Sequence, residues 1–344
     1  MKKLALFLTV SAVAILVVCS YLLFPNSGEQ RNTGKRIIRD MTGRRVVVPD
    51  DVKRVVTAMY PIATQLMFLV GAQEMLAAIS DMDVNDAMVN IYSPITSIYR
   101  PVMTNHGDIN KEELLKMHPD IVFTHTKNAR DSDFSQLGIA TVCLKLETPD
   151  QLIEGIELVG RIVNRSERAR AVAGYYRRKL EYIRSKTALV KKKKKVYFCG
   201  PAMLSAAGGD MYQNFFIEYA GGENVARQIR GGWCSVSIEH LLSWNPDLIF
   251  IGNYGTAKVE NFTKDSRLSE ISAVKNNKVF MSRFFIGSWD IPTPESILGI
   301  MWLANKLYPG EVNFDMAAEM EEFYQTCYGY RPGKKEIARV LEAP

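Results

Sequence analysis

The chain has 344 residues, 47% of them hydrophobic, so it can bury a large core in about two domains of ordinary size. This composition excludes a disordered or fibrous protein. The formal net charge of +6 is a mild excess that is compatible with an anionic ligand. The lysine run at 191–195 has no aromatic interleaving and no binding motif beside it, so we expect a solvated helix end and no nucleic-acid partner.

The first residues have the pattern of an export signal. Lys2 and Lys3 precede an uncharged apolar run, residues 4–24, and a polar segment follows. About 20 apolar residues suffice to span a bilayer, so residues 1–28 are a signal peptide or a membrane anchor. Lipidation at Cys19 and release as a free protein stay open. The two lysines favour the cytoplasmic side, which places the rest of the chain in the periplasm or on the extracellular face of the cytoplasmic membrane.

The chain then begins with short strands. Alternating residues at 36–49, on either side of Thr42-Gly43, predict a β-hairpin. A strand at 54–58 leads through a loop containing Tyr60 into a helix at 62–70 that Gly71 closes. A loop between a strand and a helix is where α/β folds place ligands.

A twelve-residue pattern occurs twice, at 112–123 and 239–250, which are 127 residues apart. The copies agree at the Glu, Leu-Leu, Pro-Asp and Phe positions. Each predicts a short helix that ends before Pro, followed by a buried strand. Because the strands are apolar at successive positions, both faces should be covered, which predicts parallel sheets in an α/β fold. Two copies this far apart indicate two similar lobes.

Two helices lie between the copies. The first begins at Thr148-Pro149-Asp150-Gln151, which has the pattern of a capping box, and reaches about residue 163. The second is expected to be capped by Ser166 and keeps a helical period to about Leu189, which corresponds to about 36 Å. We expect it to be a stiff strut between the lobes. The predicted parts are the signal or anchor at 1–28, an N-terminal lobe at 29–147, connecting helices at 148–190 and a C-terminal lobe at 191–344.

The second lobe contains no dinucleotide-binding glycine pattern after its first strand at 196–200. A last strand at 279–281 opens into residues 283–290, and helices finish the chain. Cys143 and Cys199 fall inside apolar strand patterns and are interpreted as buried thiols.

Four groups of residues carry a family resemblance: Asp40-x-x-Gly43-Arg44 with 46–49 and 54–56, the two repeat copies, 219–226, and 294–299 with 302–304 and 307–309. Over about residues 36 to 330 the chain resembles the substrate-binding proteins of ABC importers for ferric siderophores, haem, cobalamin and some oxyanions. In these class III binding proteins, two lobes are joined by one long helix.

The resemblance implies a docking role for Glu112 and Glu239, which occupy the positions where relatives present a carboxylate to arginines of the permease. An exposed glutamate favoured at a helix start is the alternative. Six residues before these carboxylates, relatives line the ligand cleft, and here the residues are His106 and Trp233. A single Trp is more often part of the core, and a single His is more often a surface residue.

The remaining candidates for ligand contact come from loops at strand ends: Tyr60, His125, Lys127, Tyr254, Arg283 and Trp289. Aromatic rings suit porphyrin, corrin or catecholate faces, whereas Arg, Lys and Tyr hydroxyl groups suit carboxylates or oxyanions. Of four histidines, His118 and His240 lie on the docking helices, so a three-histidine zinc site is not expected. We expect no resident cofactor or protein-bound metal.

These observations predict an extracytoplasmic solute-binding protein, a monomer, that delivers an iron chelate (a siderophore, haem or cobalamin-like metal complex) to an ABC permease with a cytoplasmic ATPase. A molybdate or tungstate carrier is the alternative within the class, since relatives for those anions share the pattern at 302–309. A membrane-tethered ligand sensor would not need Glu112 and Glu239. An enzyme is not expected, because no nucleophile elbow, acid pair or metal-ligand cluster is present in the sequence.

Overall fold

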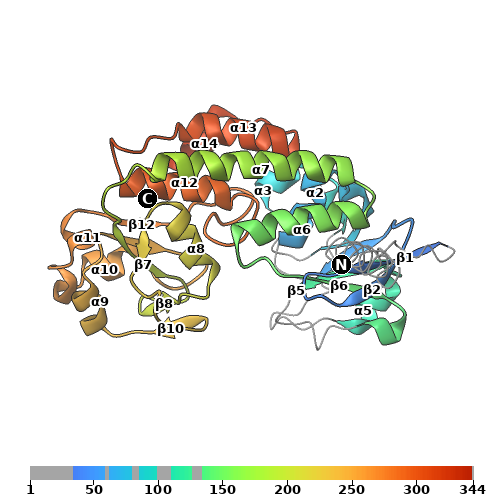
Figure 1. The fold of residues 1–344 in the computed structure, drawn as a ribbon, viewed down its shortest axis with the longest axis horizontal. Helices are drawn as coiled ribbons and strands as arrows, with labels where there is room; N and C mark the ends of the chain where they lie inside the picture. The colour runs from blue at the N-terminus through green and yellow to red at the C-terminus, as the bar shows by residue number, and fades with distance from the viewer. Residues whose placement is uncertain (1–33, 59–61, 80–84, 99–109, 126–133, 343–344) are drawn as a thin grey trace, which may run out of the picture.

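The computed structural model describes residues 34–58, 62–79, 85–98, 110–125 and 134–342. Figure 1 shows two α/β lobes with α7 running along one side of both. The predicted class, two Rossmann-like lobes joined by a long helix, is confirmed. The predictions for Cys19, Tyr60, His106, Lys127 and the N-terminal signal or anchor lie outside the described residues. Within the described ranges, no helix has both the length and the apolar character needed to cross a membrane.

The N-terminal lobe is built on a four-stranded parallel sheet in the order β4-β3-β5-β6. Its strands are β3 (Val55–Ala58), β4 (Leu76–Ala78), β5 (Ile121–His125) and β6 (Ala140–Leu144). Its helices are α2 (Ile62–Leu69), α3 (Asp86–Ile91), α4 (Ile95–Ile98) and α5 (Lys111–Lys116), with short 3₁₀ turns η1 (Gln73–Met75) and η4 (Ser135–Leu137). All four residues of β3 are buried, as expected for a strand that is covered on both faces.

The predicted hairpin is formed by β1 (Lys35–Arg39) and β2 (Arg45–Pro49), with Gly43 at φ +84° in the turn. Buried Asp40 accepts hydrogen bonds from the backbone of Thr42 (2.9 Å) and Arg44 (3.0 Å), and from Cys143 of β6 (3.2 Å). Burial alone would raise the pKa of Asp40, but these bonds and the Arg44 guanidinium hold it below its usual value. The Asp40-x-x-Gly43-Arg44 pattern therefore fixes the hairpin to the sheet.

The C-terminal lobe has a six-stranded sheet in the order β10-β8-β7-β11-β12, with β9 also paired to β7. Its strands are β7 (Lys195–Cys199), β8 (Ser205–Ala207), β9 (Glu223–Asn224), β10 (Trp233–Ser235), β11 (Leu248–Ile251) and β12 (Val279–Met281). β7, β11 and β12 are parallel, whereas β8 pairs antiparallel with both of its neighbours, β7 and β10. Its helical elements are α8 (Tyr212–Tyr219), α9 (Ile238–Trp244), α10 (Val259–Thr263), η5 (Ser266–Leu268), α11 (Ser272–Lys275), α12 (Ser296–Leu307), α13 (Met316–Tyr328) and α14 (Lys334–Leu341).

The two sequence copies fold alike, as α5-β5 and α9-β11. The aspartate of each Pro-Asp pair joins its strand to the neighbouring one. Asp120 Oδ2 accepts hydrogen bonds from the backbone N–H groups of Lys53 (2.8 Å) and Arg54 (2.9 Å) before β3, and Asp247 Oδ2 accepts one from Lys195 (2.8 Å) at the start of β7. The repeated Pro-Asp therefore sets where the two central strands of each sheet begin.

The connecting helices are α6 (Pro149–Ile162) and α7 (Ser166–Thr187). The predicted cap of α6 is present, because Thr148 accepts a hydrogen bond from the Gln151 backbone (3.1 Å) and the Gln151 side chain accepts one from the Glu147 backbone (2.8 Å). With 22 residues, α7 is about 33 Å long. It begins without the side-chain cap predicted at Ser166.

α13, which falls within the predicted C-terminal lobe at 191–344, also contacts the N-terminal lobe. α13 contacts α2, and the rings of Phe68 and Tyr328 lie 6.5 Å apart. Arg168 of α7 donates to the Leu69 carbonyl at the end of α2 (3.0 Å) and to the Cys327 carbonyl of α13 (3.2 Å). Figure 1 shows α13 lying along α7, and Lys179 of α7 forms an ion pair with Glu319 of α13. α13 therefore packs on α7 and reinforces the connection between the lobes.

The segment after β12 also bridges the lobes. Asn85, which caps α3, donates to the Ile286 carbonyl (2.9 Å). Fully buried Glu295 accepts hydrogen bonds from the backbone of Ile286 (3.0 Å) and Gly287 and from the Tyr324 hydroxyl of α13. Burial raises the pKa of Glu295 to about 7, against the effect of these bonds. One buried carboxyl group therefore organises the backbone at the junction.

A single apolar cluster runs through both lobes. It includes Val48 of the hairpin, Val172 and Tyr176 of α7, and Phe250 and Trp302 of the C-terminal lobe. Cys143 and Cys199 are fully buried free thiols, so that prediction is confirmed. The lobes share one core beneath α7.

Candidate functional site

In open α/β sheets, ligands bind outside the carboxyl ends of the parallel strands. In the C-terminal lobe, the loops at these ends begin at Gly200 after β7, Gly252 after β11 and Ser282 after β12. In the N-terminal lobe, the residues at the corresponding ends are Ala58 of β3, Ala78 of β4, His125 of β5 and Leu144 of β6.

Two aromatic side chains lie over the strand ends of the C-terminal lobe, and we call Trp233 and Tyr254 the aromatic shelf. Their ring centroids are 6.1 Å apart with an interplanar angle of 57°. The indole packs so closely on Gly200 that a Cβ there would lie 2.2 Å from the ring, and a Cβ at Gly252 would lie 2.6 Å from the ring of Tyr254. Trp233 is half-buried and Tyr254 is 42% exposed. Glycine at both strand ends thus allows the rings to lie flat on the backbone while part of their surface faces solvent.

A polar network lies behind the aromatic shelf. The Gln213 amide of α8 donates to the Tyr254 hydroxyl (3.4 Å) and to the Asp290 carbonyl (3.1 Å). The Ser288 hydroxyl lies within hydrogen-bond distance of Asp290 Oδ1 and, at 3.0 Å, of Asn253 Oδ1. Asp290 is fully buried, and burial raises the pKa of its carboxyl group although hydrogen bonds from hydroxyl groups oppose this. The network holds the hydroxyl group of Tyr254 in place through its hydrogen bond from Gln213.

On the N-terminal lobe, His125 ends β5, and its Nε2 lies 3.1 Å from Glu147 Oε1 in the segment before α6. The imidazole is thus held at the carboxyl edge of the sheet, where it was predicted.

Arg283 and Trp289 do not join the aromatic shelf. The Arg283 guanidinium lies over the ring of Trp302, 4.7 Å from its centroid, and burial lowers its pKa. Trp289 has no exposed surface and packs against Gly299 of α12. Both residues follow β12 as predicted, but their side chains turn into the lobe, so this placement gives no support to ligand contact by either one.

Sequence reasoning did not single out Gln213 or Asp290. Asp290 lies in the segment that follows β12. The sequence predicted this segment as a loop at a strand end, and that position could have identified Asp290 as a site residue. Gln213 is part of α8 and carries no pattern that distinguishes it from other helical residues.

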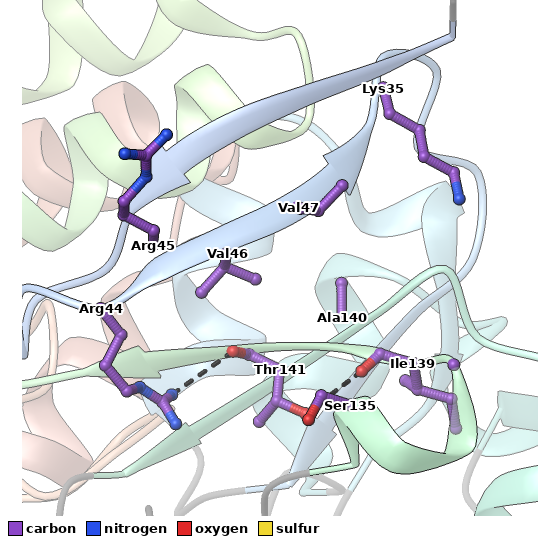
Figure 2. A pocket seen from close by; sticks show the side chains of 10 residues that line it. Lys35, Arg44, Arg45, Val46, Val47, Ser135, Ile139, Ala140 and Thr141 are labelled. Carbon is purple, nitrogen blue, oxygen red and sulfur yellow. Dashed lines mark hydrogen bonds between the residues drawn. The ribbon is translucent and has the colours of Figure 1, made fainter. Parts of the chain in front are cut away.

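Two cavities lie away from the strand ends. Figure 2 shows the first, of about 360 Å³, between β2 and the start of β6, lined by Arg44, Val46 and Thr141 among others. The second, of about 460 Å³, lies beside Phe280, Trp302 and Lys306. Within the described residues, no group of three or more His, Cys, Asp or Glu side chains could hold a metal ion.

Glu112 and Glu239 occupy equivalent positions in the two lobes. Each is in the first turn of its helix, two residues after a capping side chain, Asn110 in α5 and Ser237 in α9. Both are exposed, and the hydrogen bond from Ser237 lowers the pKa of Glu239. Neither forms an ion pair with another described residue. In Figure 1, α5 and α9 lie at the outer corners of the two lobes, on the side opposite α7.

The sequence model of the periplasmic binding protein family matches residues 56–283, about two thirds of the chain. The chain belongs to the periplasmic binding protein family. It is a periplasmic solute-binding protein of the ABC-transporter type.

Relatives of this binding protein differ in what they bind. The molybdate-binding protein MolA of Haemophilus influenzae is 26% identical over 86% of this chain and 92% of its own length. A vitamin B12-binding protein of Vibrio cholerae is 22% identical over 70% of this chain and 84% of its own length. A periplasmic solute binding protein from Veillonella parvula superimposes with a TM-score of 0.78 at 25% identity, over 90% of this chain and 97% of that one. These likenesses establish the class of the binding protein and leave its ligand to be argued from the site.

Proposed function

We propose that this binding protein captures an iron chelate between its lobes and delivers it to an ABC permease. The observation that carries the proposal is the aromatic shelf at the carboxyl ends of β7 and β11. Two rings held on glycine backbone offer a rigid apolar surface, which suits the flat or aromatic part of a siderophore, haem or cobalamin-like complex.

The proposed contacts come from both lobes. Trp233 and Tyr254 provide the ring surface of the C-terminal lobe, and His125 faces the ligand from the end of β5. Tyr60, His106 and Lys127 are proposed to complete the site from the N-terminal loops. A hydroxyl, an imidazole and an ammonium group suit the oxygen donors and negative charge of a ferric chelate.

A molybdate or tungstate carrier is the second candidate. The similarity to molybdate-binding MolA, which extends over 86% of this chain, favours it. A compact oxyanion needs converging donors more than ring faces, and Gln213, Asn253 and Lys127 are the residues we would assign to that role.

Delivery is proposed to use Glu112 and Glu239. They lie at equivalent places on two lobes that share one core, so their separation is fixed and can match two equivalent arginines of a two-fold permease. Truncating a carboxylate that becomes desolvated against arginine typically costs about 2 to 5 kcal/mol. We expect Glu112→Ala with Glu239→Ala to keep ligand affinity and to abolish transport.

The identity of the ligand is determined first, on protein purified from its own host. Native mass spectrometry with absorption spectra separates the candidates, because a Soret or charge-transfer band indicates haem or a ferric chelate and an added oxyanion mass indicates the second candidate. Titration with a ferric catecholate, a ferric hydroxamate, haemin, cobalamin and molybdate then follows tryptophan fluorescence.

Substitutions of Trp233 and of a control tryptophan, Trp244, test whether Trp233 contacts the ligand. Trp233→Phe should remove most of the quenching, whereas Trp244→Phe, on the outer helix α9, should retain it. Trp233→Ala should weaken chelate binding by about 2 kcal/mol, roughly 30-fold. Unchanged affinity of Trp233→Ala for every chelate, together with tight binding of molybdate, would replace the first candidate with the second.

A further inference from the structure

The two copies of the repeat have diverged, so the positions that remain identical are informative. Most of the identical pairs have a visible structural reason. They are buried in the core or bind the start of a neighbouring strand: Leu114 and Leu241, Phe123 and Phe250, Pro119 and Pro246, and Asp120 and Asp247.

Two identical pairs have no such reason. One is Glu112 with Glu239. The other is Leu115 with Leu242, which are 42% and 41% exposed. In each lobe the leucine follows the glutamate by three residues, so the two side chains lie on the same face of their helix.

The rest of the exposed helix surface is not shared. Glu113 and Lys116 of α5 correspond to His240 and Ser243 of α9, and Glu113 pairs with Lys116 within α5 alone. A single exposed leucine on a protein surface needs no explanation. In both lobes the same exposed leucine lies beside the same glutamate, which forms no ion pair with another described residue, and the surrounding residues differ. This indicates a shared contact.

We propose that Leu115 and Leu242 are apolar contact points for the permease, one beside each docking glutamate. The inference rests on the docking part of the proposed function and extends it. The partner that fits is a membrane permease with two equivalent halves, each presenting a basic side chain about 5 to 6 Å from an apolar hollow. Each lobe then contributes a glutamate charge that fixes how the binding protein is positioned on the permease, and a leucine whose surface becomes buried from water when the complex forms.

The test compares three variants of the full-length protein in uptake by host cells. Leu115→Gln with Leu242→Gln removes the apolar surface and keeps good helix formers. Leu115→Met with Leu242→Met keeps an apolar contact. Leu137→Gln is the matched control, because Leu137 is also 42% exposed and lies in η4, outside the repeat.

We expect the double Gln variant to lower uptake at least tenfold, with thermal stability and ligand affinity unchanged, and the double Met and Leu137→Gln variants to transport like the wild type. Full uptake by the double Gln variant would overturn the leucine contacts. If Glu112→Ala with Glu239→Ala still abolishes uptake in that case, the docking role of the glutamates stands. If the glutamate variant also transports normally, docking through these helices fails as a whole, and ligand capture, measured by titration, is unaffected.

Discussion

Glu295 should make the stability of the protein depend on pH in a way that one substitution removes. Burial raises the pKa of Glu295 from 4.5 to about 7, so the folded protein retains this proton over a range in which the unfolded chain has released it. A raised carboxyl pKa means that the stabilisation is fully present below pH 4.5 and is lost as pH rises through 7. The gap of about 2.5 pH units corresponds to roughly 3 to 4 kcal/mol at about 1.4 kcal/mol per unit, most of it within the range from pH 4.5 to 8.

The assay is urea unfolding of the wild type and Glu295→Gln between pH 4.5 and 8, followed by circular dichroism. The free energy of unfolding of the wild type, relative to the variant, should fall by about 3 kcal/mol across this range. The groups around Glu295 do not produce this slope, because burial raises the pKa of Tyr176, Tyr324, Tyr328 and Cys327, which keeps them neutral. Parallel pH profiles of the two proteins would show that the reasoning is wrong.

Three further predictions concern the strand ends and the strut. Asp120→Ala should lower the free energy of unfolding by about 2 kcal/mol, because it removes two hydrogen bonds to backbone N–H groups. Asp247→Ala removes one such bond and should lower it by about 1 kcal/mol. Equal effects of the two substitutions in urea unfolding would contradict this account. Gly200→Ala should displace the indole of Trp233 and weaken chelate binding at least tenfold with little change in melting temperature, as titration and thermal scans can check. Ligand binding should close the lobes by only a few degrees, because they share a core, and a large compaction in X-ray scattering would refute this.

Local sequence signals predicted the fold well. The turn at Thr42-Gly43, the cap at Thr148 and the two Pro-Asp pairs each depend on residues close together in the chain, and each appears in the structure as predicted. The helical period that begins at Ser166 predicted an end near Leu189, two residues beyond the end of α7 at Thr187. Turn, cap and period are short-range properties, so one sequence suffices to recognise them.

Long-range packing and side-chain direction could not be predicted in the same way. The amphipathic pattern of α13 shows that one face is buried, but not that α2 of the other lobe covers it. Arg283 and Trp289 follow a strand end, as site residues often do, yet cation–π contact with Trp302 and complete burial turn them inward. Gln213 reaches the aromatic shelf only because α8 packs beside the end of β11, which no local signal reveals.

The core shared by the lobes affects how the rate of uptake depends on the amount of binding protein. A carrier that hardly changes shape presents the same docking face whether it is empty or loaded. Empty carriers then occupy the importer as readily as full ones, and the ratio of ligand to carrier decides whether an encounter is productive. Uptake measured against increasing carrier concentration at fixed ligand should therefore rise, pass through a maximum and decline, with unloaded carrier acting as a competitive inhibitor.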